Sequence, residues 1–315
     1  MAYNQRCHKV ARRSHQPDGR GACGASRPSG SHSDFISNTP PAATPRSRPV
    51  RIESSHRKQR SLKGKSMLTG DEIERFDRDG YLVFLRLLNE PKRRKYFSVF
   101  EELVEKAKSL KTNRPPTWLL EVDAEGNPVA GVLHKVQGAG VVDFRALDMA
   151  QEPEIVSRIE SLIGPQMAIF GTKFFPKLAG GSTSVHWHQD NFYFKTESDQ
   201  IISCGIYLED ADQANGCLRV IPGSHKQGVT HHERSGLVEA KGYKAEIDES
   251  KAVDVVCPGG TVVLFSANLM HGTNDNESDK ASGRSRFSTA WHYLRPDIDL
   301  PPYSSGNNPD WHVLS

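Results

Sequence analysis

The residues best suited to chemistry lie near the middle of the chain, where a histidine and an aspartate are two positions apart. They are His188 and Asp190. On an extended strand, side chains two residues apart point to the same face. An imidazole and a carboxylate on one face, joined by a second histidine from elsewhere, form a three-ligand set that leaves coordination positions open and suits Fe(II). The spacing therefore predicts a metal site.

The surroundings of this pair distinguish it from chance occurrences of the same spacing. His32 and Asp34 repeat the pattern, but in a segment with few large apolar residues. His188 follows a Gly180-Gly181 turn and a short β-like run, and an aromatic cluster at 192–194 comes next. Aromatic side chains beside a metal can wall a substrate pocket, so we favour the second pair.

A third ligand must come from a later part of the chain, where five histidines are available: His225, His231, His232, His271 and His292. His271 fits best, because it follows a Pro-Gly-Gly turn and an apolar run and precedes a glycine, which lets the backbone approach closely. His225 lies in a Pro-Gly-Ser turn and is expected to brace it. His231 and His232 are expected to be solvated.

His186 opens an alternative, because with His188 it forms the first half of a cupin metal motif. That motif requires a glutamate four or five residues after the second histidine, and Phe192 and Tyr193 occupy these positions. We therefore expect a structural role for His186. In the alternative, a cupin-type metalloenzyme independent of 2-oxoglutarate, His186 would be required for metal binding and Asp190 would not.

An arginine after the preferred third ligand can anchor a 2-oxoacid cosubstrate. The remote carboxylate of such a cosubstrate would be buried and would need a cation with a fork geometry. Arg286 begins the strand-like run after His271, and Ser288 lies on the same face of that run. Arg284 is the alternative anchor, but it lies in a polar loop at 279–285.

The elements that position these residues change in character along the chain. Thr69 and Glu72 form a capping box, and helices are predicted over 71–78, 91–110 and 152–163, with a strand over 81–85. After residue 165, short β-like runs alternate with turn residues; they cover 167–175, 185–187, 201–208, 217–221, 261–265 and 287–293. This order predicts a mainly β fold with flanking helices, in which a sandwich or barrel core carries an N-terminal helical buttress.

The first 66 residues differ from the rest in charge and composition. They contain 14 lysines and arginines against three acidic residues, whereas residues 67–315 contain 27 against 35. Because the segment has few large apolar residues, we expect a disordered basic tail. We interpret it as an over-long gene start before Met67, with an organelle transit peptide or a nucleic-acid-binding arm as alternatives. Residues 67–315 are expected to form a single domain.

The composition of the body limits the partners and the compartment. Its acidic balance argues against nucleic-acid binding by the folded domain, and no apolar run reaches 18 residues, so no membrane association is expected. The five cysteines are odd in number and form no CxxC pair, which favours a reducing, intracellular compartment. We expect a cytoplasmic protein, a monomer or homodimer, unless the tail directs it to an organelle.

Several motifs taken together resemble the phytanoyl-CoA dioxygenase family. They are His188-Gln189-Asp190, Asn215-Gly216-Cys217-Leu218, Ile221-Pro222-Gly223-Ser224-His225 and His271-Gly272-Thr273, with a similar opening at 77–83. The resemblance implies a double-stranded β-helix (jelly-roll) core at about 165–295, and Fe(II), 2-oxoglutarate and O2 as reactants. It implies His188, Asp190 and His271 as metal ligands. It further implies contacts to 2-oxoglutarate from Arg286, Lys135, Gln189 and Thr273.

The activity that this resemblance implies is hydroxylation of an aliphatic C–H bond in a small molecule, with ascorbate in support. Asp190 favours hydroxylation over halogenation, because a halogenase needs a small residue at that position to admit chloride. A non-catalytic alternative is a metal-stabilised jelly-roll module that binds a ligand through the aromatic cluster at 192–194. Such a module would need neither the complete ligand set nor Arg286. The sequence does not indicate which substrate is used.

Overall fold

The computed structural model describes residues 67–234, 243–279, 283–300, 303 and 308–314, so the expectations for residues 1–66 lie outside the described residues. The α-helices are α1 (Gly70–Asp79), α2 (Glu90–Ala107), α3 (Ala139–Val142), α4 (Phe144–Ala150), α5 (Pro153–Ile163) and α6 (Asp190–Phe194). The strands are β1 (Tyr81–Phe84), β2 (Trp118–Val122), β3 (Pro128–Gln137), β4 (Ala168–Phe175), β5 (Val185–His188), β6 (Ile201–Tyr207), β7 (Leu218–Val220), β8 (Glu233–Arg234), β9 (Tyr243–Lys244), β10 (Val253–Val255), β11 (Thr261–Ser266), β12 (His271–Thr273), β13 (Ser288–Leu294) and β14 (Trp311–Val313). None of the described helices is long and apolar enough to cross a membrane.

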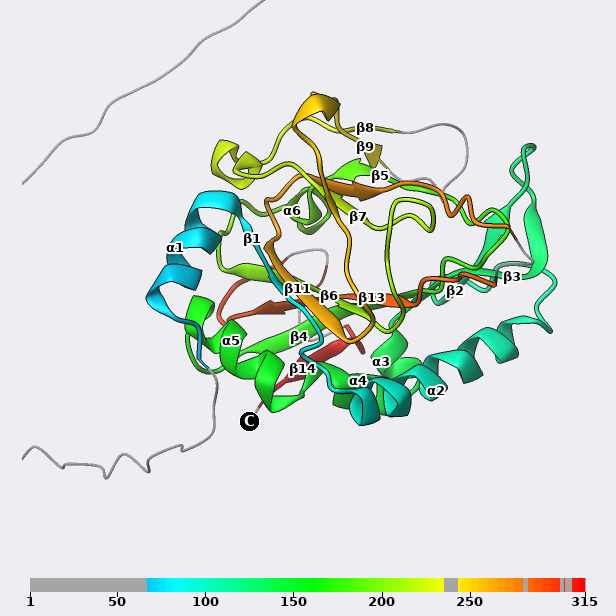
Figure 1. Ribbon diagram of the computed structural model, residues 1–315, viewed down its shortest axis with the longest axis horizontal. Coiled ribbons are helices and arrows are strands. Elements are labelled where there is room, and N and C mark those ends of the chain that lie inside the picture. The colour runs from blue at the N-terminus through cyan, green and yellow to red at the C-terminus, as the bar shows by residue number, and fades with distance from the viewer. Residues whose placement is uncertain (1–66, 235–242, 280–282, 301–302, 304–307, 315) are drawn as a thin grey trace, which may run out of the picture. The chain divides into compact units, whose positions relative to one another are not determined.

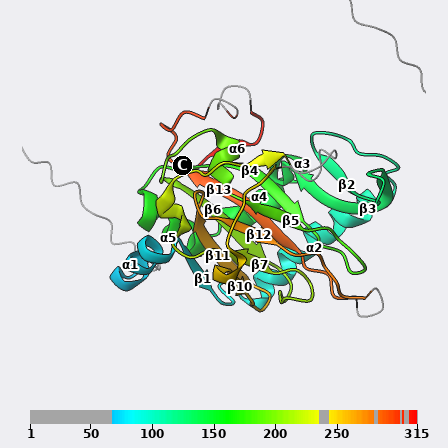
Figure 2. The same ribbon diagram turned by 90° about the horizontal axis from the view of Figure 1, so that it is seen from above.

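Two antiparallel sheets are built from strands that alternate along the chain. The larger sheet has the order β1-β11-β6-β13-β4-β3-β2, with β14 also paired to β4, and the smaller sheet has the order β10-β7-β12-β5. The chain therefore crosses repeatedly between β4, β6, β11 and β13 in one sheet and β5, β7, β10 and β12 in the other, which is the jelly-roll arrangement. Figures 1 and 2 show the smaller sheet lying over the larger one. The predicted mainly β fold with a jelly-roll core is confirmed.

Helices α2, α4 and α5 cover the face of the larger sheet that points away from the smaller sheet (Figure 1). Phe100 of α2 packs on Phe174 of β4, with ring centroids 4.6 Å apart. Tyr293 of β13 donates a hydrogen bond to the carbonyl oxygen of Ala150 at the end of α4. These contacts bury the outer face of the sheet, as the predicted helical buttress requires, and leave the inner face for the site.

Local sequence signals locate most of the predicted elements to within a few residues. Thr69 accepts a hydrogen bond from the backbone N–H of Glu72, and the Glu72 carboxylate accepts one from the backbone N–H of Thr69, so the predicted capping box starts α1. Gly80 ends the helix in the left-handed region, at φ 83°. The elements that the sequence did not predict are the strands β2, β3, β8, β9, β10, β12 and β14 and the short helices α3, α4 and α6.

Candidate metal centre

The three side chains predicted to bind a metal come together between the two sheets. His188 is the last residue of β5, Asp190 is the first of α6 and His271 is the first of β12. Strands β5 and β12 are neighbours, and His188 lies opposite His271 in their register. One ligand atom from each side chain lies within 4.8 Å of the other two, and among the described residues this is the one group of three or more metal-ligating side chains with such spacing.

The backbone around Asp190 differs from the prediction, which placed it on the same extended strand as His188. The strand ends at His188, Gln189 is still extended, and Asp190 begins the helical turn α6. This turn swings the carboxylate back toward both rings. Asp190 Oδ1 lies 3.7 Å from His188 Nε2, and Oδ2 lies 3.8 Å from His271 Nε2.

Backbone carbonyl groups fix the orientation of both imidazole rings. Nδ1 of His188 lies 2.7 Å from the carbonyl oxygen of His186, and Nδ1 of His271 lies 2.9 Å from that of Leu269. A carbonyl only accepts, so both Nδ1 atoms carry the proton and both Nε2 lone pairs are left for a metal, which is the usual arrangement of a metal-binding histidine. Burial and the nearby His188 lower the pKa of His271 to about 4, so this ring is neutral near pH 7.

Asp190 supplies the negative charge of the group. Burial alone would raise the pKa of its carboxyl, but the surrounding histidines and Lys173 outweigh burial and hold that pKa well below its usual range. The hydroxyl of Ser203 donates to Asp190 Oδ2 at 2.6 Å. Two imidazoles that present Nε2 and one ionised carboxylate fit Fe(II) in both donor type and number.

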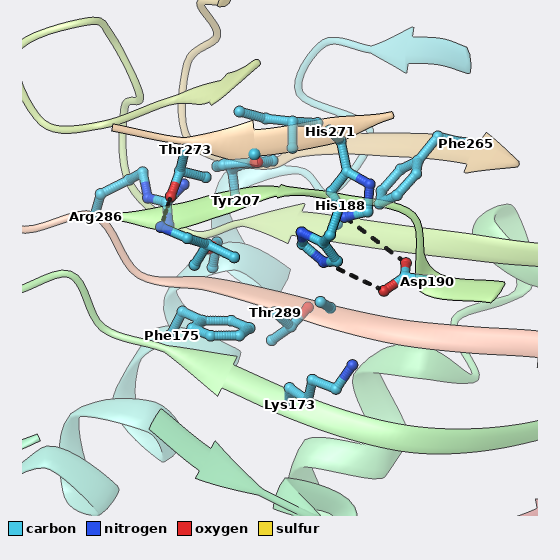
Figure 3. Close-up of a pocket in the computed structure, with 16 residues that line it drawn as sticks. Lys173, Phe175, His188, Asp190, Tyr207, Phe265, His271, Thr273, Arg286 and Thr289 are labelled. Atoms are coloured by element: carbon cyan, nitrogen blue, oxygen red, sulfur yellow. Dashed lines mark hydrogen bonds and ion pairs between the residues drawn. The ribbon is translucent and has the colours of Figure 1, made fainter. Parts of the chain in front are cut away.

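A pocket extends from these three side chains toward Arg286 (Figure 3). Both sheets line it, through Lys173, Phe175, Val185, His188, Asp190, Gly205, Tyr207, Leu218, Phe265, His271, Gly272, Thr273, Arg286, Ser288, Thr289 and Ala290. Arg286 is only 2% exposed, and its Nε has no hydrogen-bond partner among the described residues. Burial lowers the pKa of its guanidinium. A buried cation without an anion is costly, and a ligand carboxylate would remove that cost.

The other residues predicted around Arg286 divide into two groups. Thr273 and Ser288 both line the pocket, and the Thr273 hydroxyl also accepts a hydrogen bond from the backbone N–H of Val185. Arg284, the alternative anchor, instead forms an ion pair with Asp212 in which both side chains are more than one-third exposed. The geometry therefore favours Arg286 over Arg284 as the residue that faces a ligand.

Lys135 lies on β3, behind the pocket wall. Its Nζ is 5.9 Å from the ring centroid of Phe175, which lines the pocket. Burial and the neighbouring Lys173 lower the pKa of Lys135 to about 8. Lys135 is not one of the lining residues, and its predicted contact with 2-oxoglutarate stays a prediction.

The side chain of Gln189 is engaged outside the pocket. It forms hydrogen bonds with the backbone of Gly228, Thr230 and Asn268. Gln189 therefore joins the segment after β7 to the segment before β12, and it is not one of the residues that line the pocket. Its predicted contact with 2-oxoglutarate stays a prediction.

Of the remaining candidate histidines, His231 is exposed, as expected, whereas His225 and His232 have structural positions. His225 Nε2 lies 3.0 Å from the backbone carbonyl of Asp77, so it braces its turn as predicted. His232, which we expected to be solvated, is buried: its ring stacks on Phe192 at 4.2 Å, and its Nε2 accepts a hydrogen bond from the backbone N–H of Gln189. The expectation was wrong because His232 lies in a polar stretch of sequence that folds back over α6.

Comparison with known protein families shows which family the chain belongs to. Residues 76–285 match the family described as Phytanoyl-CoA dioxygenase (PhyH). The chain belongs to the phytanoyl-CoA dioxygenase family. The resemblance inferred from the sequence motifs is thereby confirmed.

Individual relatives agree with this assignment to the phytanoyl-CoA dioxygenase family. The chain is 20% identical over 266 residues to ectoine dioxygenase of Bordetella parapertussis, covering 79% of this chain and 82% of that protein. It is 27% identical over 245 residues to human peroxisomal phytanoyl-CoA dioxygenase, covering 73% and 71%. It also shares its fold with EctD from S. alaskensis, solved with 2-oxoglutarate and 5-hydroxyectoine, at a TM-score of 0.57 and 19% identity over 76% of this chain and 81% of that one.

Several residues around the site were not predicted from the sequence. Lys173 and Phe175 of β4 and Tyr207 of β6 line the pocket. His292 of β13, which the sequence offered only as a candidate metal ligand, instead contacts the serine that supports Asp190. The alternation of side chains along β4 puts Lys173 and Phe175 on one face, which is a signal in the sequence. The signal becomes usable only when the inner face of the strand is known.

Proposed function

We propose that this member of the phytanoyl-CoA dioxygenase family is an Fe(II)- and 2-oxoglutarate-dependent dioxygenase that hydroxylates an aliphatic C–H bond of a small molecule. The observation that carries the proposal is the presence of two features in one pocket: a two-histidine, one-carboxylate group, and a buried arginine that has no anionic partner among the described residues. The first suits Fe(II), and the second suits a cosubstrate with a remote carboxylate.

In this proposal each part of the pocket has a defined task. His188, Asp190 and His271 hold Fe(II), and Arg286 binds the remote carboxylate of 2-oxoglutarate, with Thr273 and Ser288 beside it. The bound iron supplies the redox chemistry, in which O2 and 2-oxoglutarate are converted to succinate, CO2 and a hydroxyl group on the substrate, and ascorbate supports it by keeping iron reduced. The protein itself orients the reactants and excludes water.

Two alternatives from the sequence are less well supported. A cupin-type site needs His186 as a ligand, but His186 is not part of the described ligand group, whereas Asp190 is. A binding module without turnover gives no reason for the buried guanidinium of Arg286, whose Nε has no hydrogen-bond partner among the described residues. Both features favour the dioxygenase.

The test uses the full chain with Fe(II) and 2-oxoglutarate. Without O2, chelation of the iron by 2-oxoglutarate should give the visible charge-transfer band of such complexes. On addition of O2 and ascorbate, succinate should form even without a primary substrate. Asp190→Ala should lower both signals at least 100-fold, and His186→Ala should retain both. If the wild-type protein gives neither signal, the proposal is wrong; if only His186→Ala loses metal, the cupin-type site is correct.

We also propose that residues 67–315 act as one dioxygenase domain, with the jelly-roll core at about 165–295, and that the protein works in the cytoplasm as a monomer or homodimer. The free, buried cysteines Cys204, Cys217 and Cys257 are consistent with a reducing compartment. Mass measurement of the purified protein by light scattering tests the oligomeric state.

A further inference from the structure

Lys173 is the second cation in the pocket, beside Arg286. It lies on β4 and lines the pocket together with the three metal-ligating side chains. Its described contact is with His292, whose Nε2 is 3.1 Å from Lys173 Nζ. No carboxylate among the described residues forms an ion pair with it. In Figure 3 its ammonium lies toward Asp190, whereas Arg286 lies at the other end of the pocket.

A hydrogen-bond chain of fixed direction holds this ammonium in place. Ser203 has a single hydroxyl proton and donates it to Asp190 Oδ2, at 2.6 Å. Ser203 Oγ must then accept from His292 Nδ1, at 3.0 Å. The His292 ring is therefore protonated at Nδ1, and its Nε2 accepts from Lys173. Burial, with Lys173 as the next cause, lowers the pKa of His292 to about 3, in keeping with a neutral ring.

Glycine at position 171 makes room for this chain. Gly171 has φ +59°, and a Cβ atom there would lie 3.0 Å from Cδ2 of His292. The ring of His292 can therefore lie against β4 and reach Lys173 on the same strand. An ammonium has three N–H donors, and the chain uses one, so two donors of Lys173 are left for a ligand.

A count of charges shows what kind of ligand would complete the pocket. The residues that line it include one carboxylate, Asp190, and two cations, Lys173 and Arg286. Fe(II) and the 2-oxoglutarate dianion cancel each other, so one positive charge is left. Lys135, close enough to Lys173 to lower its own pKa, adds to this excess. An uncompensated charge in a partly buried site is unfavourable, and a second anion would neutralise it.

We propose that the primary substrate carries a carboxylate or phosphate group that binds the ammonium of Lys173. The inference rests on the proposed function and names its substrate class. Lys173 is then a specificity-determining residue: it selects anionic substrates, and its hydrogen bond to His292 keeps it pointing into the pocket.

The test uses simple anions in place of the unidentified substrate. Propionate, inorganic phosphate and the neutral propionamide are titrated into the anaerobic complex of the full chain with Fe(II) and 2-oxoglutarate, and the change of the visible band is followed. At least one anion should perturb the band saturably, and propionamide should not. Lys173→Gln removes a charge-assisted hydrogen bond, which contributes about 1.5–3 kcal/mol. The variant should therefore bind that anion about 10- to 100-fold more weakly than the wild type.

Two further variants sharpen the comparison. Lys173→Arg keeps the charge and should keep the anion response, and Lys108→Gln, which changes an exposed lysine paired with Glu105, should behave as wild type. A response to propionate alone identifies a carboxylate substrate, and a response to phosphate alone identifies a phosphate substrate.

Several results would overturn the inference while the proposed function stands. They are a band that neither anion perturbs, a response to propionamide equal to that of propionate, and equal anion affinity in wild type and Lys173→Gln. A fourth is loss of 2-oxoglutarate binding in Lys173→Gln with an unchanged melting temperature, which would assign the lysine to 2-oxoglutarate. Absence of the band in the wild type would instead overturn the proposed function, and this inference with it.

Discussion

Two arginines separated by one residue differ completely in environment. Arg286 is buried in the pocket and has no anionic partner in the described part of the chain, whereas Arg284 forms an exposed ion pair with Asp212. A buried charge-assisted contact contributes about 3 kcal/mol, whereas an exposed ion pair contributes 0 to about 1 kcal/mol. The two positions therefore form a natural pair for mutagenesis.

Arg286→Met should weaken 2-oxoglutarate binding about 100-fold, because it removes the cation that neutralises the remote carboxylate. Arg284→Met should change the same affinity less than about two-fold. Titration of 2-oxoglutarate into the anaerobic Fe(II) protein measures both. Equal weakening by the two variants would contradict the assignment of Arg286.

Ser203 has no predicted role in the sequence, yet it links Asp190 to His292. Ser203→Ala should lower Fe(II) affinity about 10- to 100-fold, which is the usual effect of removing a partner that orients a metal ligand. Ser98→Ala, at an exposed hydroxyl on α2, is the matched control. Equilibrium competition with a metal chelator measures both, and an unchanged affinity in Ser203→Ala would show that Asp190 needs no such support.

The site residues that the sequence predicted can be recognised from short stretches of sequence, whereas those it missed are brought together by strand pairing. His188 and Asp190 are two residues apart, and His271 is flanked by a glycine turn and a glycine, so local patterns suffice to select them. Ser203 and His292 belong to different strands, β6 and β13, that pair with each other. Their contact depends on strand register, which no local pattern in the sequence encodes.

At the scale of elements, β14 is tied to β4 by more than strand pairing. The buried carboxylate of Asp310 accepts hydrogen bonds from both the backbone N–H and the hydroxyl of Thr172, each at 2.6 Å. Thr172 is the neighbour of Lys173 on β4. The segment before β14 therefore supports the strand that carries a pocket residue.

Asp310→Ala should lower the free energy of unfolding by about 3 kcal/mol, because it leaves the buried N–H of Thr172 without an acceptor. Asp297→Ala removes a carboxylate from an exposed ion pair with Arg295 and should change stability by less than about 1 kcal/mol. Urea unfolding measures both variants. Equal effects would mean that water replaces the Asp310 carboxylate.

Elements were predictable where an apolar pattern or a cap lies in one stretch of sequence. The capping box at Thr69 and the buried run of β6 are examples. The C-terminal strand β14 was missed because it has only three residues, Trp311–Val313, too few for a periodic pattern. Helix α6 was missed because it has only five residues and begins after a single residue, Gln189, that follows β5. The metal-ligand spacing suggested that the strand continued.

At the scale of the whole domain, Lys177 is a buried cation that joins segments from both sheets. Its Nζ donates to the carbonyl oxygens of Thr183, before β5, and Asn274, after β12. Burial, with Arg286 as the next cause, lowers the pKa of Lys177 to about 7. An unfolded lysine has a pKa of about 10.4.

This difference makes global stability depend on pH. Between about pH 7 and pH 10 the unfolded chain holds a proton on Lys177 that the folded protein has lost, so the free energy of unfolding rises with pH in this window. Relative to Lys177→Met, the wild type should gain about 2 kcal/mol from pH 7 to pH 9. Urea unfolding of both proteins at the two pH values measures the gain. Parallel pH profiles would show that Lys177 stays protonated in the folded state.

The pairing of β1 with β11 has a consequence for synthesis. Tyr81 lies opposite Phe265 and Phe84 opposite Val262 in that pair, so β1 is synthesised some 180 residues before the strand that pairs with it. At about 5–20 residues per second, that delay is roughly 10–35 s. During it the apolar run from Tyr81 to Phe84 has no strand to pair with. We therefore expect this domain to begin folding more slowly than domains built from local contacts. We also expect a chaperone to protect the run while the chain is being made.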